Sequence, residues 1–345
     1  MDGQTLVLVT GSGRSGTSSL AGSLARLGLH VPLPVVEARD MNPKGLYETS
    51  WVVKFHADLL REAMVRSSDG SPRALERVSA TVAASPAAEQ LQTWLAAQPE
   101  PRLAVKDNQA CWFLDTWYAA ASACGRDLSL LTALRHPAEV VGSRDLVWGE
   151  GREEQERRSR ETTNVAAWLN GALATELAGR GRTRAFIPYV DLLDDWRAAL
   201  GRVDGQLGLA LPVPPPGQPH ELDEWLDPGL RRSQLTWADL AVPDRLRELA
   251  EEAWQAMLAL VADPHDPAAT ARLDDVRAGY GQLYDESFAL ARDESRHLQK
   301  AAARRSADKL RGRVRELRAR LRDREHDGEP DPTGVLGRVA RRLRP

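Results

Sequence analysis

The sequence predicts an α/β fold: a central parallel sheet with helices on both faces, followed by a long C-terminal helix. Two patterns predict it. Short apolar segments alternate with amphipathic stretches, and a helical spacing of apolar residues continues for more than 25 residues near the C-terminus. With 345 residues, 42% of them hydrophobic and 28% charged, the chain has the composition of a globular protein that buries a sizeable core.

Four apolar segments are the predicted strands. They are residues 5–10, 103–105, 128–134 and 184–190, the last being the weakest candidate. Helical stretches separate them, which is the order that produces parallel strands joined by crossover helices. Residues 245–260 read as a further amphipathic helix.

The C-terminal helix is expected to begin at Asp266, an N-cap residue followed by proline at the first helical position. A second apolar seam follows at Leu310, Val314, Leu317 and Leu321. This seam covers two heptads, so a solvated charged helix remains an equal alternative to a coiled coil. We therefore predict three parts: an α/β domain over 1–265, a partly packed and partly coiled-coil-like helix over 266–325, and a flexible basic tail over 326–345.

Charge is unevenly distributed along the chain. The net charge is −3, yet residues 299–345 carry 15 Lys and Arg against 7 Asp and Glu. From this region we expect self-association through the helix, and weak contact of the basic segment 335–344 with an anionic membrane surface. We expect no nucleic-acid partner.

The cysteines, the apolar runs and the spacing of possible metal ligands bear on where the protein is located and on whether it binds a metal. Cys111 and Cys124 do not make a disulfide framework, and no apolar run approaches the about 20 residues that span a bilayer. We therefore expect a cytoplasmic protein, at most peripheral to the inner membrane face. No metal site is expected, because the sequence has no pattern of closely spaced metal ligands.

A glycine-rich loop over residues 11–17 is the first functional motif. Between a strand and a helix, such a loop gathers backbone N–H groups at a helix N-terminus and binds phosphate or sulfate. Gly11 and Gly16 have the separation found in nucleoside triphosphatases, but Thr17 replaces the lysine of that motif, and Arg14 carries the positive charge inside the loop.

A second motif follows the third predicted strand. Arg135 stands at the strand end, Pro137 falls in the first turn of the next helix, and Ser143 comes eight residues after the arginine. An arginine fork and a hydroxyl can then face one phosphate.

Together these motifs resemble those of the sulfotransferases that use 3′-phosphoadenosine-5′-phosphosulfate (PAPS). The resemblance covers about residues 4–260, includes the Tyr-x-Asp-Leu-Leu segment at 189–193, and is greatest to bacterial carbohydrate-type members. It implies that Arg135 and Ser143 bind the 3′-phosphate of the donor. It also implies that the 5′-phosphosulfate is held by the loop residues Gly13, Arg14, Ser15, Gly16, Thr17, Ser18 and Ser19.

The resemblance implies a chemistry as well. PAPS is the co-substrate and 3′-phosphoadenosine 5′-phosphate (PAP) the product, and no metal is needed. The acceptor is expected to be a hydroxyl of a carbohydrate, a glycolipid or a glycosylated metabolite. Transfer of a loosely bound sulfuryl group depends mainly on positioning and charge, so Arg14 is expected to neutralise the leaving phosphate.

The general base is expected to be Glu48, because carbohydrate sulfotransferases often place a glutamate after the loop helix. The alternative is that Glu48 caps a helix beginning near Ser50. Lys106 is expected to assist the sulfuryl group, or to form an ordinary ion pair with Asp107. Asn108 stands where cytosolic relatives have a histidine base, so the sequence departs from their mechanism.

For several residues and for the function of the protein, the sequence leaves more than one interpretation open. The Arg-Lys-Gly donor motif near the C-terminus of cytosolic members is absent, and residues 231–233 (Arg-Arg-Ser) either replace it or form a solvated charge pair. His136 either positions the second motif or lies on a surface loop, while His30 and His56 look isolated. A P-loop kinase or nucleotide hydrolase would need a lysine in place of Thr17. A non-catalytic assembly protein would not need Arg14, Arg135 and Ser143.

Overall fold

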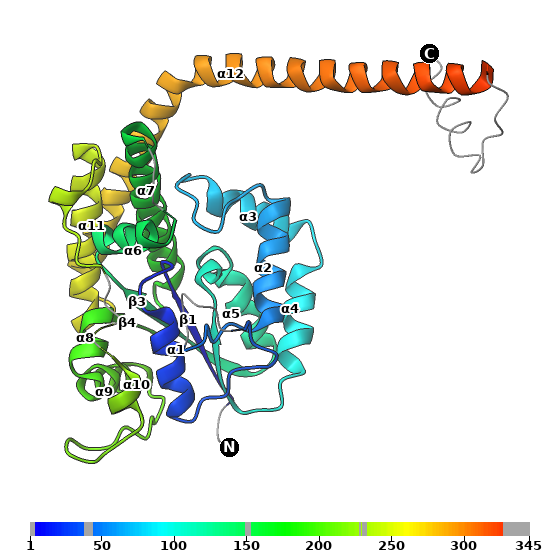
Figure 1. The fold of residues 1–345 in the computed structure, drawn as a ribbon. Helices are drawn as coiled ribbons and strands as arrows, with labels where there is room; N and C mark the ends of the chain where they lie inside the picture. The colour runs from blue at the N-terminus through cyan, green and yellow to red at the C-terminus, as the bar shows by residue number, and fades with distance from the viewer. Residues whose placement is uncertain (1–3, 38–43, 149–152, 228, 230–232, 327–345) are drawn as a thin grey trace. The chain divides into compact units, whose positions relative to one another are not determined.

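The computed structural model describes residues 4–37, 44–148, 153–227, 229 and 233–326 (Figure 1). The chain divides into two compact units, Met1–Tyr284 and Asp285–Pro345, which are described separately below. The three-part functional division made from the sequence stays a prediction.

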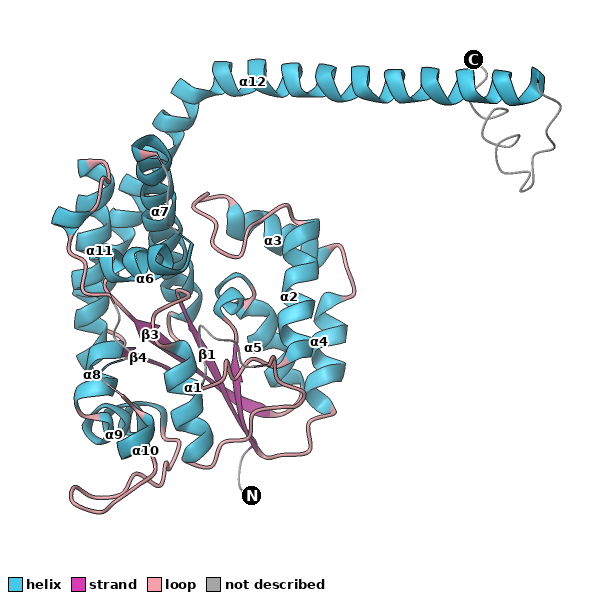
Figure 2. Ribbon diagram, viewed as in Figure 1, coloured by secondary structure: helices cyan, strands magenta, loops and turns pink. Residues whose placement is uncertain are grey.

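The core of the first unit is a parallel sheet of four strands (Figure 2). The strands are β1 (Gln4–Gly11), β2 (Arg102–Lys106), β3 (Arg126–Leu134) and β4 (Arg184–Pro188), in the order β2-β1-β3-β4. Each coincides with one of the four predicted segments. The apolar segments are therefore confirmed as buried strands, the weakest candidate included.

The helices follow the strands as the alternating pattern predicts. They are α1 (Thr17–Arg26), α2 (Ser50–Glu62), α3 (Ala74–Ala83), α4 (Ala87–Ala96), α5 (Leu114–Ala123), α6 (Pro137–Trp148), α7 (Glu154–Gly179), α8 (Tyr189–Asp194), α9 (Trp196–Leu207), α10 (Leu222–Trp225), α11 (Asp244–Ala262) and α12 (Pro267–His326), with 3₁₀ turns η1 (Asn108–Trp112) and η3 (Trp237–Asp239). The predicted start of the C-terminal helix at Asp266-Pro267 is confirmed, since α12 begins at Pro267.

Successive side chains of β1 point to opposite faces of the sheet, and both faces are buried. Leu6 and Leu8 pack with residues of α2, α3, α4 and α5, whereas Val7 and Val9 pack with α1, α8 and α9 (Figure 1). A third cluster joins α6, α7, α11 and the first part of α12 next to β4. The predicted α/β architecture with helices on both faces is therefore confirmed.

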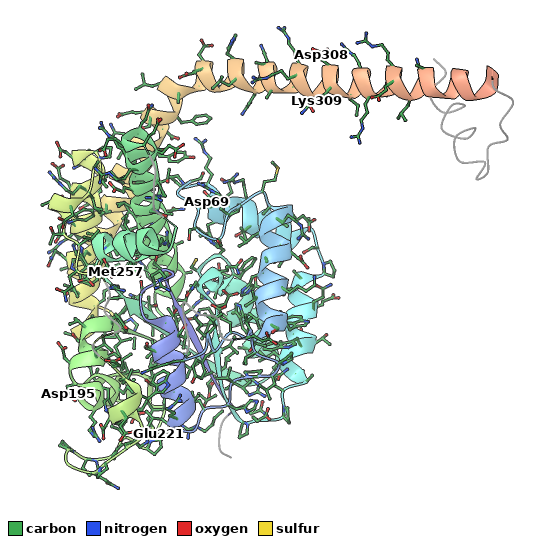
Figure 3. All side chains as sticks on the ribbon, in the orientation of Figure 1. Asp69, Asp195, Glu221, Met257, Asp308 and Lys309 are labelled. Atoms are coloured by element: carbon green, nitrogen blue, oxygen red, sulfur yellow. The ribbon has the colours of Figure 1, made fainter. Side chains whose placement is uncertain are left out.

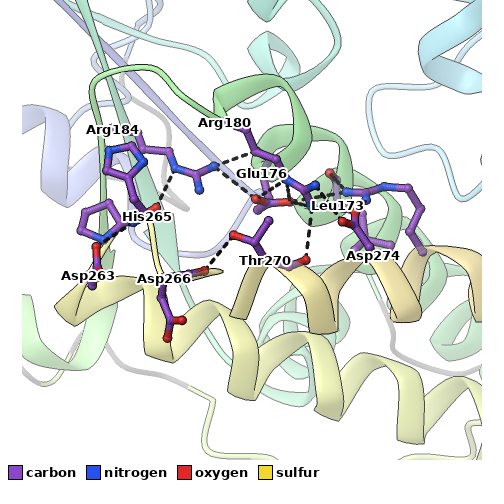
Figure 4. A network of polar contacts seen from close by, with 11 residues as sticks. Leu173, Glu176, Arg180, Arg184, Asp263, His265, Asp266, Thr270 and Asp274 are labelled. Atoms are coloured by element: carbon purple, nitrogen blue, oxygen red, sulfur yellow. Dashed lines mark hydrogen bonds and ion pairs between the residues drawn. The ribbon is translucent and has the colours of Figure 1, made fainter. Parts of the chain in front are cut away.

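A network of charges fastens the start of α12 within the first unit (Figure 4). The Glu176 carboxylate on α7 is fully buried and accepts hydrogen bonds from Arg180 at 2.7–3.0 Å and from Arg184 at 3.3 Å. Arg180 also binds both oxygens of Asp274 on α12, at 2.8 and 2.9 Å. Arg277 on α12 reaches Glu176 at 3.5 Å. Three guanidinium groups and two carboxylates are therefore close to balance in this network.

The second unit is described from residue 285 to residue 326 and consists of the remainder of α12. Figure 3 shows side chains such as Asp308 and Lys309 projecting from this helix. Its leucines keep much of their surface exposed, 67% for Leu310 and 48% for Leu317. Pairing of this helix with another remains a prediction. No helix among the described residues has the length and apolar character needed to span a membrane.

Candidate functional site

The strand order brings the two predicted motifs to one edge of the sheet. From β1 the chain crosses to β2 on one side, and it later returns to β3 on the other side of β1. Ligands of open α/β sheets bind beyond the carboxyl ends of the strands, where the direction of winding reverses. A cavity of about 610 Å³ lies there, lined by residues that follow β1, β2 and β3.

The wall of this cavity is strongly basic. Among the residues that the structure describes, six lysines and arginines line it, against the two carboxylates of Glu48 and Asp107. The basic residues are Arg14, Lys44, Lys106, Arg135, Arg144 and Arg160. This excess of positive charge favours an anionic ligand.

The conformation of the loop after β1 requires glycine at position 16. Gly16 has a φ of 84°, and a Cβ added to it would lie 2.1 Å from Cδ2 of Tyr189. No other residue fits there without displacing that ring. No side chain caps α1 at Gly16, so the first N–H groups of the helix are the natural donors for an anion.

The two predicted motifs contact each other directly. Nε of Arg14 donates to Oγ of Ser143 at 3.0 Å. Nη1 of Arg135 donates to the carbonyl of Arg14 at 3.0 Å, and Nη2 donates to the carbonyl of Ser233 at 2.9 Å. Nε of Arg135 binds Glu139 at 2.9 Å. The strand-end arginine and the loop arginine therefore stand side by side at the cavity.

Tyr189, the first residue of α8, covers the loop. Its ring lies against Gly16 and 5.3 Å from the guanidinium carbon of Arg135. Burial raises the pKa of its phenol, although a hydrogen bond with Ser19 and the charge of Arg135 act in the opposite direction. The phenol therefore stays neutral at physiological pH. From the sequence, this residue is identified only as the start of the Tyr-x-Asp-Leu-Leu segment, and its ring contact with Gly16 could not be predicted from spacing.

Glu48 and Lys106 form an ion pair at the cavity wall. The lysine side chain is buried, and the glutamate is 16% exposed. Glu48 does not cap α2, because the N-cap residue is Thr49 and no side chain caps that helix. Lys106 is not paired with Asp107 in the contacts described. Both alternatives raised for these residues are therefore absent, and the two predicted catalytic side chains are neighbours.

Asp107 instead has a buried histidine as its partner. Nε2 of His56 accepts a hydrogen bond from the Trp117 indole at 3.0 Å. An indole N–H can only donate, so the proton of a neutral His56 lies on Nδ1, which is 2.8 Å from Oδ2 of Asp107. Oδ1 of Asp107 accepts the Gln109 N–H at 2.9 Å. The Asp107 carboxylate is thus held on both oxygens, and His56 is not isolated as its sequence context suggests.

Two further side chains tie the loop to neighbouring elements. Oγ1 of Thr17 donates to Oδ1 of Asn108 at 3.0 Å, so the residue at the relatives' histidine position supports the loop. Arg144 donates to Asn164 at 2.8 Å and to the hydroxyls of Ser12 and Ser68 at 3.2 and 3.3 Å. Arg144 was not among the predicted site residues, although its position directly after Ser143 on a predicted helix was an available signal.

A second side of the cavity is formed by α7, η1 and a short segment before α3. Its wall includes two tryptophans, two serines and amides: Trp112, Trp168, Ser67, Ser68, Gln109 and Asn164. Trp117 is fully buried in the core. Arg144 links this side to the loop, since it donates to Ser12 as well as to Ser68 and Asn164.

The remaining predicted residues have mixed positions. Gly13, Thr17, Ser18 and Ser19 line the cavity, whereas Ser15 does not: it is buried, and its N–H donates to the Ser12 carbonyl at 3.0 Å. Arg231 and Arg232 lie outside the described residues.

His136 lies away from the cavity lining. Its Nε2 is 3.1 Å from Glu251, and its ring packs against Trp237 and Trp254. Burial acts to raise the pKa of Glu251, but hydrogen bonds from Trp237, Gln255 and His136 bring it below its ordinary value. His136 thus joins β3 to α11. Among the described residues, no group of His, Cys, Asp and Glu is arranged to hold a metal ion.

No family model and no curated protein matches this sequence. Two solved structures give weak likenesses. The sulfotransferase domain of the Synechococcus PCC 7002 olefin synthase is 20% identical, with 70% of this chain and 86% of that chain covered and a TM-score of 0.37. Sulfotransferase STF1 from Mycobacterium tuberculosis H37Rv is 16% identical, with 73% of this chain and 76% of that chain covered and a TM-score of 0.37.

Proposed function

We propose that this protein is a sulfotransferase that moves a sulfuryl group from PAPS to a hydroxyl acceptor. The contact between Arg14 and Ser143 carries the proposal, because it joins the loop after β1 to the arginine–serine motif after β3. Two motifs that are more than 120 residues apart then serve one cavity.

The basic cavity supports a donor with several negative charges. In the proposal, Arg14 and the N–H groups of the loop hold the 5′-phosphosulfate, and Arg135 with Ser143 holds the 3′-phosphate. A volume of about 610 Å³ falls within the range of small-molecule sites. The six basic wall residues match a donor whose phosphates and sulfate need several cations.

The transfer step requires a base and charge neutralisation. The acceptor oxygen forms a bond to sulfur while the bond from sulfur to the bridging phosphate oxygen breaks, and PAP leaves with that electron pair. Glu48 takes the proton of the acceptor hydroxyl, and its ion pair with Lys106 keeps the carboxylate at the cavity wall. Arg14 neutralises the leaving phosphate, and Lys106 the sulfuryl oxygens.

The second side of the cavity would hold the acceptor. Its tryptophans, serines and amides are suited to a hydroxyl-bearing ring, because aromatic faces cover apolar ring surface while hydroxyls and amides make hydrogen bonds. We therefore propose a carbohydrate or glycoconjugate acceptor.

The decisive experiment is thermal unfolding of the full chain with PAP, ATP or GTP. PAP should raise the melting temperature, whereas ATP and GTP should have little effect. Arg14→Ala and Ser143→Ala should each reduce the shift caused by PAP. Arg61→Ala, which changes an exposed arginine on α2, should leave it intact.

Three results would contradict the proposal. The first is no stabilisation by PAP. The second is full stabilisation retained in Arg14→Ala and Ser143→Ala together. The third is magnesium-dependent consumption of ATP, which would favour the kinase or hydrolase alternative. Incubation with labelled PAPS and extracts of the source cell then tests transfer itself: PAP binding without any labelled product would indicate a non-catalytic protein.

A further inference from the structure

The second half of α12 carries a longer apolar seam than the four residues first identified. Positions separated by four and three residues in turn are occupied by small or aliphatic side chains from 303 to 321. They are Ala303, Ala307, Leu310, Val314, Leu317 and Leu321. Leu310 and Leu317 are 67% and 48% exposed, so a large part of this seam is open to a partner.

The residues that flank the seam are basic. In a coiled coil, the positions on either side of the apolar pair face the flanking positions of the partner and select it. Here these positions are Gln299, Arg304, Ser306, Arg311, Arg313, Arg318 and Arg320, which include five arginines and no acid. Over residues 299–321 the helix has nine Lys and Arg against two Asp and Glu. A partner needs acidic residues at its own flanking positions.

A second copy of this helix does not satisfy that need. In a parallel pair, Arg313 of one copy would face Arg318 of the other, while only Arg320 would find an acid, Glu325, beyond the last apolar residue of the seam. In an antiparallel pair centred on Arg311, the two copies of that arginine would face each other, and Arg304 would face Arg318. Like charges in these positions oppose pairing.

A membrane surface fits the seam less well than a helix does. Helices that lie in a bilayer surface bury a wide apolar face rich in bulky residues such as Trp, Phe and Leu. Residues 299–321 contain no aromatic residue, and Ala303 and Ala307 lie on the seam. A narrow stripe with small side chains is better suited to the close approach of one other helix.

We infer that residues 299–321 of α12 pair with an acidic helix of another protein, in a coiled coil of two different chains. Leucine and valine of the seam supply the buried contact, and the flanking arginines bind glutamate or aspartate on the partner. This inference replaces self-association, which the sequence analysis expected for the same helix, and it does not depend on the proposed activity.

The test uses the full chain and two synthetic peptides. Both peptides are about four heptads long with the same leucine seam, but one has glutamate and the other lysine at every flanking position. In calorimetric titrations at physiological salt, the chain should bind the glutamate peptide at least about tenfold more tightly than the lysine peptide. Higher salt should weaken that binding, because screening reduces attraction between exposed charges.

Matched variants distinguish binding through the seam from binding through any exposed leucine of the helix. Leu310→Asp combined with Leu317→Asp should abolish binding of the glutamate peptide. Leu290→Asp combined with Leu298→Asp changes two leucines that are also exposed but lie off the seam, and should leave binding intact. Changing Arg311, Arg313 and Arg318 together to glutamate should reverse the preference toward the lysine peptide. Circular dichroism checks that each variant keeps its helix.

Three outcomes would overturn the inference. One is equal affinity for the two peptides. Another is a dimer of the full chain at low micromolar concentration in sedimentation equilibrium that Leu310→Asp with Leu317→Asp dissociates, since this identifies a second copy as the partner. The last is seam-dependent binding to vesicles of phosphatidylglycerol and phosphatidylcholine without binding to the glutamate peptide, which identifies a membrane.

Discussion

Two groups of arginines in the first unit use the same side chain in different ways. Around Glu176, Arg180 and Arg184 donate to one buried carboxylate, and Arg180 also binds Asp274 (Figure 4). At the cavity, Arg135 gives one of its three hydrogen bonds to a carboxylate and two to main-chain carbonyls. The first group has three arginines for two carboxylates, whereas the six basic residues of the cavity have the two carboxylates of its wall and Glu139, which binds Arg135.

The difference separates a structural role from a binding role. Charges that cancel inside the protein hold elements together and leave little field for a ligand. An unbalanced basic wall beside a cavity costs stability when the site is empty, and an anion relieves that cost. Variants of the first group should therefore change stability but not donor binding, whereas loss of an arginine from the cavity wall should change donor binding with little loss of stability.

The largest effect is expected for Glu176→Gln. Burial already lowers the pKa of Arg184, and the carboxylate of Glu176 counteracts this, so its loss leaves a buried guanidinium without compensation. The free energy of unfolding should fall by about 3 kcal/mol or more, measured by denaturant titration. Glu156→Gln, on an exposed part of the same helix, should change it by less than about 0.5 kcal/mol. A loss equal to that of the control would mean that the network does not stabilise the fold.

Glu48→Gln should lower turnover, and it should also lower stability because it leaves the buried Lys106 ammonium without its carboxylate. If Glu48 is the base, kcat should fall by about 100-fold or more while the stabilisation by PAP remains. Asp107→Asn is the comparison, because both oxygens of Asp107 already accept hydrogen bonds from His56 and Gln109. A larger loss of kcat in Asp107→Asn than in Glu48→Gln would transfer the role of base to Asp107.

Gly16→Ala should damage the cavity through its backbone. The new methyl group would meet the ring of Tyr189, and the residue would keep an unfavourable positive φ. We expect a loss of about 2 kcal/mol in stability together with a clear loss of PAP binding. Gly205→Ala, at an exposed helical position with nothing near the added Cβ, should instead stabilise the protein by about 0.5 kcal/mol. Unchanged PAP binding in Gly16→Ala would exclude the loop from the donor site.

The smallest effect on stability is expected for Asp274→Asn, and this effect should decrease at acid pH. The hydrogen bond from Arg180 lowers the pKa of this carboxyl below 3.8, although burial opposes the shift. Its contribution is therefore present above pH 3.8 and is lost as the pH falls through the lower value of the folded state. Because half of the side chain is exposed, Asp274→Asn should cost at most about 0.5 kcal/mol at pH 7 and less at pH 3, measured by denaturant titration. A cost that grows on acidification would contradict this assignment.

The strands, the loop and the strand-end arginine could be predicted because their signals are local. A run of apolar residues that stops at glycines identifies β1 and its loop, and Arg135 with Pro137 marks the passage from β3 to α6. The convergence of the two motifs on one ligand was implied by the resemblance to the sulfotransferases, and the order of the parallel strands gives its physical basis.

The rest of the site depends on packing between distant segments. His56 and Asp107 are 51 residues apart and meet only because α2 packs beside the end of β2. The pairing of Glu48 with Lys106 likewise joins two segments whose relative position no periodicity reveals. The cavity wall on α7 escaped prediction because its residues are spread over a 26-residue helix that looks mostly polar in sequence.

The pairing of β1 with β3 has a consequence for how this protein can diverge. Gly11 and Ala133 are register partners, so the loop and the strand-end arginine begin from two backbones held together by ladder hydrogen bonds. The distance between the two proposed phosphate positions is thus set by main-chain geometry that substitutions hardly alter. The opposite wall comes from α7 and residues 67–68, outside that ladder. Selection or directed evolution could therefore change the acceptor through this wall while the donor remains the same.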